Sequence, residues 1–441
     1  MRPGNRWLFR IRLACLLAAL LCLCGCASFG RGVTEAVLAS QGRDQDDRRQ
    51  CMVDGEAFSG LAPLLRAQAD QGAIVAGDTG RHTTKLVYIH GIGVHQPGHG
   101  ARLLRSLAQE LGLDVRADLT KRIVLAPPAP PERPMGEVNF ARVVDTERRR
   151  ELIFVELTWD AITLPEREAM AFDASAVHTS QRAALNQSIR NFTNNVLPDP
   201  LAFAGNRGGD ILDAVQQTLC WAVSTSWDAL PAKTQGVRCE ESPSPGARVG
   251  ADDLVITTHS LGSRATVDAL QKLAQSAAQA AAAGSQPSPP FAGFSEKTIT
   301  LFMLSNQLPL LEAGRDPQLI TGRRQDYCGA DAPKAPGRFL GRLDMVAITD
   351  PNDLLSYPVP QRWVDEYLDS RLCVNVRNVI INIAPVRSLP VFGEFADPLA
   401  HTGYVGDPRV IALMTGGIGH DEALPLTVER CSWVEVDPGL N

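Results

Sequence analysis

The stretch Leu254-Val255-Ile256-Thr257-Thr258-His259-Ser260-Leu261-Gly262 decides the fold class of this chain. Its first residues are apolar with β-formers, which predicts a short buried strand. One serine then follows, with the small residues Thr258 and Gly262 two positions before and after it, and the alanine-rich residues 265–283 after it predict a helix. A serine on a tight turn between a strand and a helix projects from the end of the strand, and the next backbone N–H can bind an oxyanion. The stretch therefore predicts that Ser260 is a nucleophile.

Strands and helices alternate along the chain on both sides of this stretch. Further strands are predicted at 86–89, 152–157, 298–304, 344–349 and 374–383, and further helices at 101–111, 179–195 and 208–224. Strands that alternate with helices indicate a mainly parallel central sheet with helices on both faces. The predicted fold class is α/β.

Chemically active residues follow the ends of the predicted strands in a meaningful order. His90-Gly91-Ile92-Gly93 follows the first clear strand, and Ser260 ends a later one. Asp350 and Asp353 follow the strand predicted at 344–349, and His401 comes about twenty residues after the strand predicted at 374–383. A serine hydroxyl needs a base such as imidazole to take its proton, and the imidazole needs a carboxylate on its other nitrogen. This order predicts a Ser–His–Asp triad.

The same order resembles that of the α/β-hydrolase superfamily, and the resemblance covers roughly residues 80–420. It implies an α/β-hydrolase fold in which Ser260 is the nucleophile and His401 the base. It also implies an oxyanion hole made by the backbone N–H groups of Leu261 and Ile92.

The acid and the base each have a competing candidate. Asp353 is favoured as the acid because the family's acid sits a few residues past its strand, whereas Asp350 fits a turn residue. His420 is late and near glycines, which makes it a rival base. His401 fits better, because a small residue precedes it and Tyr404 follows three residues later.

His90, His95 and His99 also fall close together in the chain. Their run is rich in Gly and Pro and sets no fixed ligand face, so a zinc-type site is not indicated. We interpret His90 as a residue that braces the oxyanion loop through hydrogen bonds, and we expect no metal and no cofactor.

Residues 1–25 are predicted to be a signal peptide. Four arginines and no acid precede an apolar stretch of about a dozen residues, too short for the roughly 20 residues that span a membrane. Leu23-Cys24-Gly25-Cys26 resembles the bacterial lipobox, which implies cleavage before Cys26 and lipid attachment there. With Ala27 next, the resemblance favours the periplasmic face of the outer membrane. The alternative is an ordinary signal peptide with incidental cysteines.

The composition narrows the class of partner. Without the four arginines of residues 1–25, 39 Lys and Arg stand against 49 Asp and Glu, so the remaining chain carries about −10. An acidic chain without basic runs is a poor candidate for nucleic-acid binding.

The cysteines indicate an oxidising compartment. Six remain besides Cys26, none of them in a CxxC pair, which permits up to three disulfides of unknown pairing, with buried free thiols as the alternative. They are Cys51, Cys220, Cys239, Cys328, Cys373 and Cys431.

These patterns divide the chain into three regions. They are the signal peptide at 1–25, a lipidated tether and N-terminal extension at 26–80 with one or two helices, and a hydrolase domain at 81–441. A helical cap is expected at about 161–250. By analogy with the fold, the expected function is hydrolysis of carboxylic esters, small-molecule or lipid, through an acyl-enzyme. The alternatives are an acyltransferase on the same triad, or a non-catalytic envelope lipoprotein. The commonest form of the serine turn has glycine where this chain has Thr258, and this difference leaves the non-catalytic alternative open.

Overall fold

The computed structural model describes residues 51–75, 80–127, 134–174, 182–241, 244, 246–284, 289–313, 315–329, 337–389, 393–396 and 400–434. The predicted signal peptide and the predicted lipid-attachment residue Cys26 lie outside these ranges. Within them, no helix has both the length and the apolar character needed to cross a membrane.

A mixed sheet of eleven strands forms the centre of the molecule, in the order β13-β1-β10-β9-β8-β7-β2-β5-β4-β3-β6. The run from β10 to β5 is parallel throughout, and β4 pairs antiparallel with both β5 and β3. The strands are β1 (Cys51–Asp54), β2 (Thr84–Ile89), β3 (Asp114–Leu125), β4 (Gly136–Val144), β5 (Glu151–Thr158), β6 (Lys233–Val237), β7 (Asp253–His259), β8 (Thr298–Leu304), β9 (Arg342–Thr349), β10 (Val374–Ile381) and β13 (Cys431–Trp433). The α/β class and the mainly parallel sheet are confirmed.

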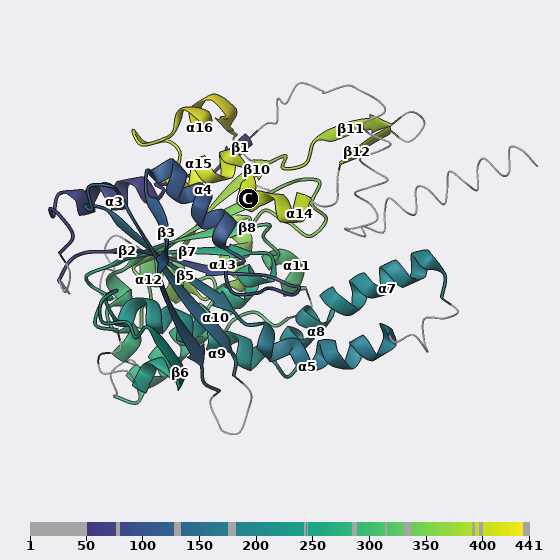
Figure 1. The fold of residues 1–441 in the computed structure, drawn as a ribbon, viewed down its shortest axis with the longest axis horizontal. Coiled ribbons are helices and arrows are strands. Elements are labelled where there is room, and N and C mark those ends of the chain that lie inside the picture. Colours follow the sequence, from purple (N-terminus) through teal and green to yellow (C-terminus); the bar gives the residue numbers. More distant parts are fainter. Residues whose placement is uncertain are drawn as a thin grey trace, which may run out of the picture.

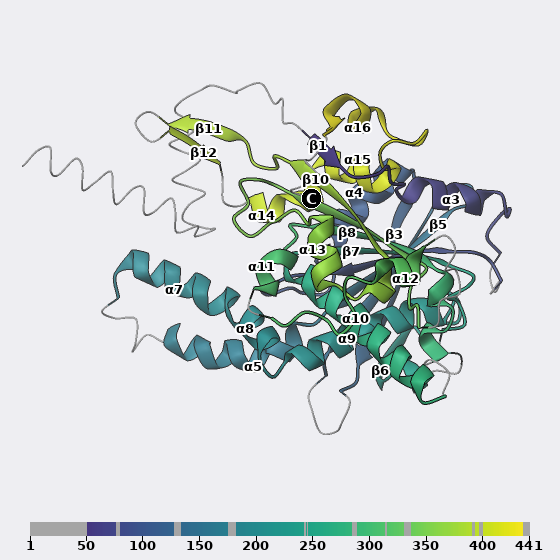
Figure 2. The same ribbon diagram turned by 180° about the vertical axis from the view of Figure 1, so that it is seen from behind.

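Helices cover both faces of the sheet (Figures 1 and 2). One layer contains α3 (Leu61–Ala69), α4 (Ala101–Leu111) and α15 (Pro408–Gly416), and the other contains α9 (Gly208–Ser224) and α10 (Leu261–Ala282). Each layer closes its own apolar core against the sheet. Strands covered on both faces bury nearly every side chain, which is why β2, β5 and β9 are almost continuously apolar in sequence.

The described residues also form shorter helices that pack around these layers. They are α11 (Leu308–Glu312), α12 (Arg324–Cys328), α13 (Gln361–Tyr367), α14 (Ala400–Gly403) and α16 (Pro425–Arg430).

Two segments extend beyond the sheet on the same side of the molecule (Figure 1). The first contains α5 (Asp160–Ala171), α7 (Ala184–Val196) and α8 (Pro198–Ala204), and the second is the hairpin of β11 (Val386–Leu389) and β12 (Gly393–Ala396). The expected cap at 161–250 stays a prediction. In the described part of that stretch, α9 packs on the sheet and β6 pairs with β3, whereas α5, α7 and α8 form the segment that extends beyond the sheet.

All six described cysteines are paired. The disulfides are Cys51–Cys431, Cys220–Cys239 and Cys328–Cys373. Three disulfides were the predicted maximum, and the alternative of buried free thiols is wrong.

Candidate active site

Ser260 occupies a sharp turn between β7 and α10. Its backbone has φ 56° and ψ −126°, in the left-handed half of conformational space, which costs a non-glycine residue on the order of 1–3 kcal/mol. The surrounding structure holds this conformation, because the Ser260 N–H donates to the Leu304 carbonyl of β8 at 3.0 Å. The order strand, turn, helix is the one predicted from the sequence.

Glycines let the turn and the loop after β2 touch. A Cβ on Gly262 would lie 2.5 Å from the Ile89 carbonyl oxygen, and a Cβ on Gly91 would lie 2.5 Å from the Cβ of Ser260. Neither position tolerates a side chain. Thr258 is accommodated on the other side of the turn, where its hydroxyl lies 2.9 Å from the Ser263 hydroxyl.

The structure brings Ser260, His401 and Asp353 together. His401, in α14, places Nε2 2.9 Å from Ser260 Oγ and Nδ1 3.0 Å from both carboxylate oxygens of Asp353. Asp353 lies on the turn after β9, and only 1% of its side chain is exposed. Burial raises the pKa of Asp353, but the hydrogen bonds and charge of His401 and the hydroxyl of Ser305 outweigh it, so the pKa lies below its ordinary value. The carboxylate is therefore ionised at neutral pH.

Asp350 has a different role from Asp353. Its fully buried carboxylate accepts the N–H groups of Ile383 at 2.7 Å, Ala384 at 3.1 Å and Asn352 at 2.7 Å. These bonds tie the turn after β9 to the end of β10. Of the two candidate acids, Asp353 is the one beside His401.

Sequence reasoning missed Ser305, which ends β8 with φ 53°. Its hydroxyl donates to Asp353 Oδ2 at 2.7 Å and lies 2.7 Å from His401 Nδ1, whose proton it can accept. In sequence, a serine directly after a strand is an ordinary turn residue, so its residue type alone indicates no role at the site. Only the position of β8 beside β7 marks Ser305.

Tyr404 and His259 complete the surroundings of the base. The Tyr404 hydroxyl donates to Asp353 Oδ2 at 3.2 Å and accepts the Asp350 N–H at 2.8 Å. His259 Nε2 lies 2.7 Å from the His401 carbonyl oxygen and donates to it. Burial, with the nearby His401, lowers the pKa of His259 to about 3, so this donor stays neutral.

His90 braces the loop that follows β2. Its Nδ1 donates to the Gly91 carbonyl at 2.8 Å, its Nε2 accepts the Trp159 N–H at 3.2 Å, and its ring stacks on the Trp159 ring at 4.8 Å. Burial lowers the pKa of His90 well below its ordinary value. Because the Gly91 carbonyl and the Ile92 N–H share one rigid peptide plane, the His90 hydrogen bond also sets the direction of that N–H.

The two predicted oxyanion donors belong to segments that touch Ser260. Ile92 follows Gly91, which packs directly on the serine. Leu261 begins α10, and the first N–H groups of a helix have no acceptor within the helix.

His95 and His99 have partners of their own. Their rings lie 4.1 and 4.8 Å from that of His90, His95 Nε2 bonds the Ile92 carbonyl at 3.1 Å, and His99 Nδ1 lies 2.9 Å from Glu156 Oε1. In the part of the chain that the structure describes, no three or more His, Cys, Asp or Glu side chains are arranged to hold a metal ion.

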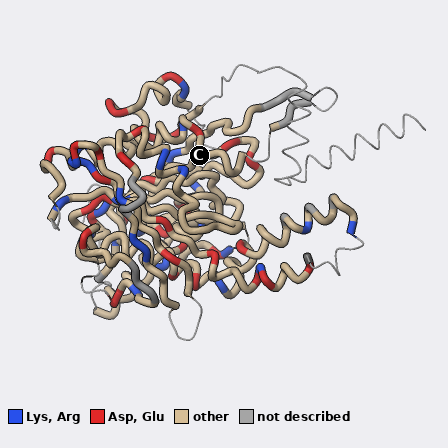
Figure 3. The backbone as a smooth tube through the Cα atoms, viewed as in Figure 1, with Lys and Arg blue, Asp and Glu red and all other residues tan. Residues whose placement is uncertain are grey.

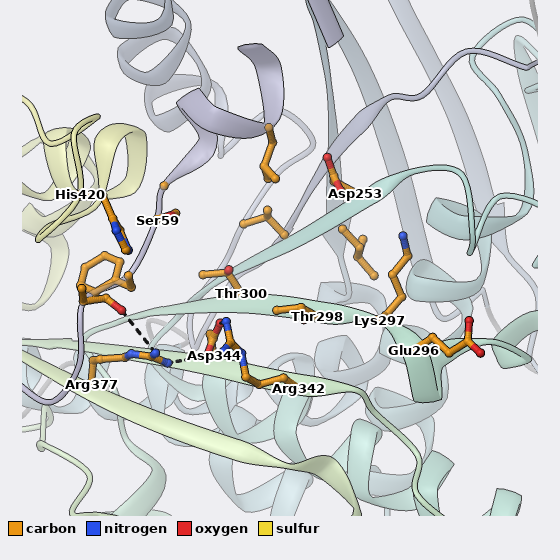
Figure 4. Close-up of a pocket in the computed structure, with 16 residues that line it drawn as sticks. Ser59, Asp253, Glu296, Lys297, Thr298, Thr300, Arg342, Asp344, Arg377 and His420 are labelled. Atoms are coloured by element: carbon orange, nitrogen blue, oxygen red, sulfur yellow. Dashed lines mark hydrogen bonds and ion pairs between the residues drawn. The ribbon is translucent and has the colours of Figure 1, made fainter. Parts of the chain in front are cut away.

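A cavity of about 370 Å³ lies at the other end of the parallel strands from Ser260, where β7, β8 and β9 begin (Figure 4). Its charged side chains largely neutralise one another: Asp344 pairs with both Arg342 and Arg377. The rival base His420 lines this cavity, and its side chain is exposed. It is not among the contacts of Ser260, whereas His401 is.

No family model matches the chain, and no curated protein or solved structure matches it either. The class of this protein must therefore be inferred from its α/β fold and from the geometry around Ser260.

Proposed function

We propose that this chain is a serine hydrolase of the α/β-hydrolase fold that cleaves carboxylic esters. The observation that carries the proposal is the continuous line of hydrogen bonds from Ser260 Oγ through His401 to Asp353. Each partner presents the atom that the chemistry requires: a hydroxyl, the two ring nitrogens of a histidine, and an ionised carboxylate.

The reaction would run in two halves. His401 Nε2 takes the proton of Ser260 Oγ as the oxygen attacks the ester carbonyl, and Asp353 stabilises the imidazolium. The N–H groups of Leu261 and Ile92 bind the oxyanion, for which each donor contributes roughly 3–4 kcal/mol. His401 then protonates the leaving alcohol, and a water activated by the same histidine hydrolyses the acyl-enzyme.

The strained serine supports the specific fold. A nucleophile elbow presents its serine on a sharp strand-to-helix turn, with the acid and the histidine later in the chain. Ser260, Asp353 and His401 follow that order, and Ser260 has the positive φ of such a turn. The close approach of Gly91 and Gly262 is what a narrow oxyanion site needs.

We also propose that the protein acts in the cell envelope. Disulfides persist in oxidising compartments, and the three disulfides here support export. Removal of residues 1–25 and lipid attachment at Cys26 would place it on the periplasmic face of the outer membrane. The substrate would then be a small-molecule or lipid ester.

Labelling with a fluorophosphonate probe tests the nucleophile. The full chain should be labelled, Ser260→Ala should not be, and His401→Ala should react much more slowly. Absence of labelling in a folded wild type would favour a binding role. Product analysis with an added alcohol would separate hydrolysis from acyl transfer.

The two candidate acids provide a matched pair. Asp353→Asn should lower kcat by roughly 10⁴-fold, because the amide cannot hold the histidine in the required tautomer. Asp350→Asn keeps an acceptor for the N–H groups of Ile383 and Ala384 and should lose far less. Ester hydrolysis by both variants measures the difference, and equal losses would contradict the assignment.

A further inference from the structure

Helices α5 and α8, outside the sheet, hold the loop that carries the Ile92 donor. The Gly93 N–H donates to Asp199 Oδ2 of α8 at 2.7 Å, and the Gly93 carbonyl accepts from Arg167 Nη1 of α5 at 3.1 Å. Gly93 has φ 104°, a conformation that favours glycine. The residue directly after Ile92 is thus bound at both of its backbone polar groups.

The side chains of Arg167 and Asp199 form one buried unit. Arg167 Nη1 lies 3.3 Å from Asp199 Oδ1, Thr163 donates to the same oxygen at 2.7 Å, and Arg167 Nη2 donates to the Asp160 carbonyl at 2.7 Å. Asp199 and Thr163 are fully buried, and 8% of Arg167 is exposed. Removing one member of a buried ion pair leaves the other charge uncompensated, so this unit has one low-energy arrangement.

Charged residues recur along this helical segment (Figure 3), and its other ion pairs join parts of the segment to one another or to neighbouring residues. Asp173 binds Arg182 and Arg190, and Glu166 binds Arg207 at 3.0 Å. None of these three ion pairs reaches the loop after β2. The pair Arg167–Asp199 differs from them because it ends on Gly93.

Three side chains hold the backbone on the two sides of Ile92. His90 holds the Gly91 carbonyl, His95 holds the Ile92 carbonyl, and Asp199 holds the Gly93 N–H. Both peptide planes that flank the Ile92 Cα are therefore fixed, one of them from α8. The plane that carries the Ile92 N–H is held by His90 at the Gly91 carbonyl, and the next plane is held at both ends, so the Ile92 backbone has little freedom to turn that N–H away from the site.

We propose that Arg167 and Asp199 are positioning residues, through which helices α5 and α8 set the direction of the Ile92 N–H in the oxyanion hole. The proposal rests on the proposed serine hydrolase function. Movement of these helices then changes the rate of the chemical step, not only access to the site.

The test compares Asp199→Ala and Arg167→Met with Glu166→Gln, which breaks an ion pair on the same helix without touching the loop. Hydrolysis of p-nitrophenyl acetate gives kcat and KM, and fluorophosphonate labelling gives the rate at Ser260. Misplacing one oxyanion donor should lower kcat by roughly 10–100-fold with little change in KM. Glu166→Gln should behave as the wild type.

Further outcomes separate the alternatives. Asp199→Asn keeps an oxygen for the Gly93 N–H and should recover part of the loss, and it carries the test if Asp199→Ala does not fold. Variants that label as fast as a reactive wild type would overturn the positioning role and leave the serine hydrolase intact. Equal losses in Glu166→Gln would mean a merely structural role, and a wild type without labelling would remove the proposed function itself.

Discussion

Ser260 and Ser305 end neighbouring parallel strands, and both have a positive φ, 56° and 53°. Strained non-glycine residues persist only where the surroundings over-determine them, and they concentrate at functional sites. Ser260 directs its hydroxyl to one nitrogen of His401, and Ser305 directs its hydroxyl to the other nitrogen and to Asp353. We infer that Ser305 helps to hold the histidine and its acid in line.

Replacing Ser305 separates its hydroxyl from its backbone. Ser305→Ala and Ser305→Gly should both lower kcat by about tenfold, since a hydrogen bond to a charged group contributes roughly 1.5–3 kcal/mol. Glycine tolerates the positive φ, so Ser305→Gly should unfold at a temperature at least as high as Ser305→Ala. Ester kinetics and thermal unfolding measure the two effects. Full activity in both variants would show that the hydroxyl is dispensable.

Among the secondary-structure elements, strand β7 and helix α14 are in direct contact at the site. His259 ends β7 and donates to the His401 carbonyl, so the strand that precedes Ser260 also holds the short helix that carries His401. The neutral form of His259 suits this half-buried position, because loss of solvent disfavours a charged ring.

The contact between His259 and the His401 carbonyl predicts that the protein loses stability in acid. The pKa of His259 is about 3 in the folded chain and 6.5 when unperturbed, so between these values the unfolded chain binds more protons. The free energy of unfolding should therefore fall as the pH drops from about 6.5 towards 3. Urea unfolding across this range measures it.

His259→Gln keeps an N–H donor but cannot titrate, so its stability should depend less on pH. His420→Gln, at an exposed histidine, is the matched control and should keep the wild-type slope. Identical slopes for all three proteins would rule out His259 as the source.

At the scale of the whole molecule, one disulfide joins the two described ends of the chain. Cys51 in β1 and Cys431 in β13 are 380 residues apart, and their strands pair at one edge of the sheet. A cross-link across so long a loop restricts the unfolded chain strongly. The edge strands therefore depend on it more than the central parallel strands do.

Replacing both cysteines by serine should lower the free energy of unfolding by about 2–4 kcal/mol. Urea unfolding under non-reducing conditions measures the change. Labelling of Ser260 at low temperature should persist, because Ser260 and Asp353 follow the central strands β7 and β9. Unchanged stability, or loss of labelling in a folded variant, would contradict this division.

Local pattern alone predicted much of the central fold. The helix at 101–111 coincides with α4, whose leucines recur at helical spacing, and the strand at 298–304 coincides with β8. Strands that local pattern did not predict include β1, β3, β4 and β6. Asp114–Leu125 carries charged residues throughout its first part, because this region lies near the sheet edge, and β1 is only four residues long.

The sequence by itself determined the α/β class and brought Ser260, His401 and Asp353 forward, because strand ends, turns and residue types are local properties. Only the tertiary structure separated Asp353 from Asp350, paired the cysteines, and placed Ser305, Arg167 and Asp199 around the site. These choices depend on which strands and helices become neighbours across tens to hundreds of residues. Strand order and side-chain packing set such contacts, and no single stretch of sequence contains them.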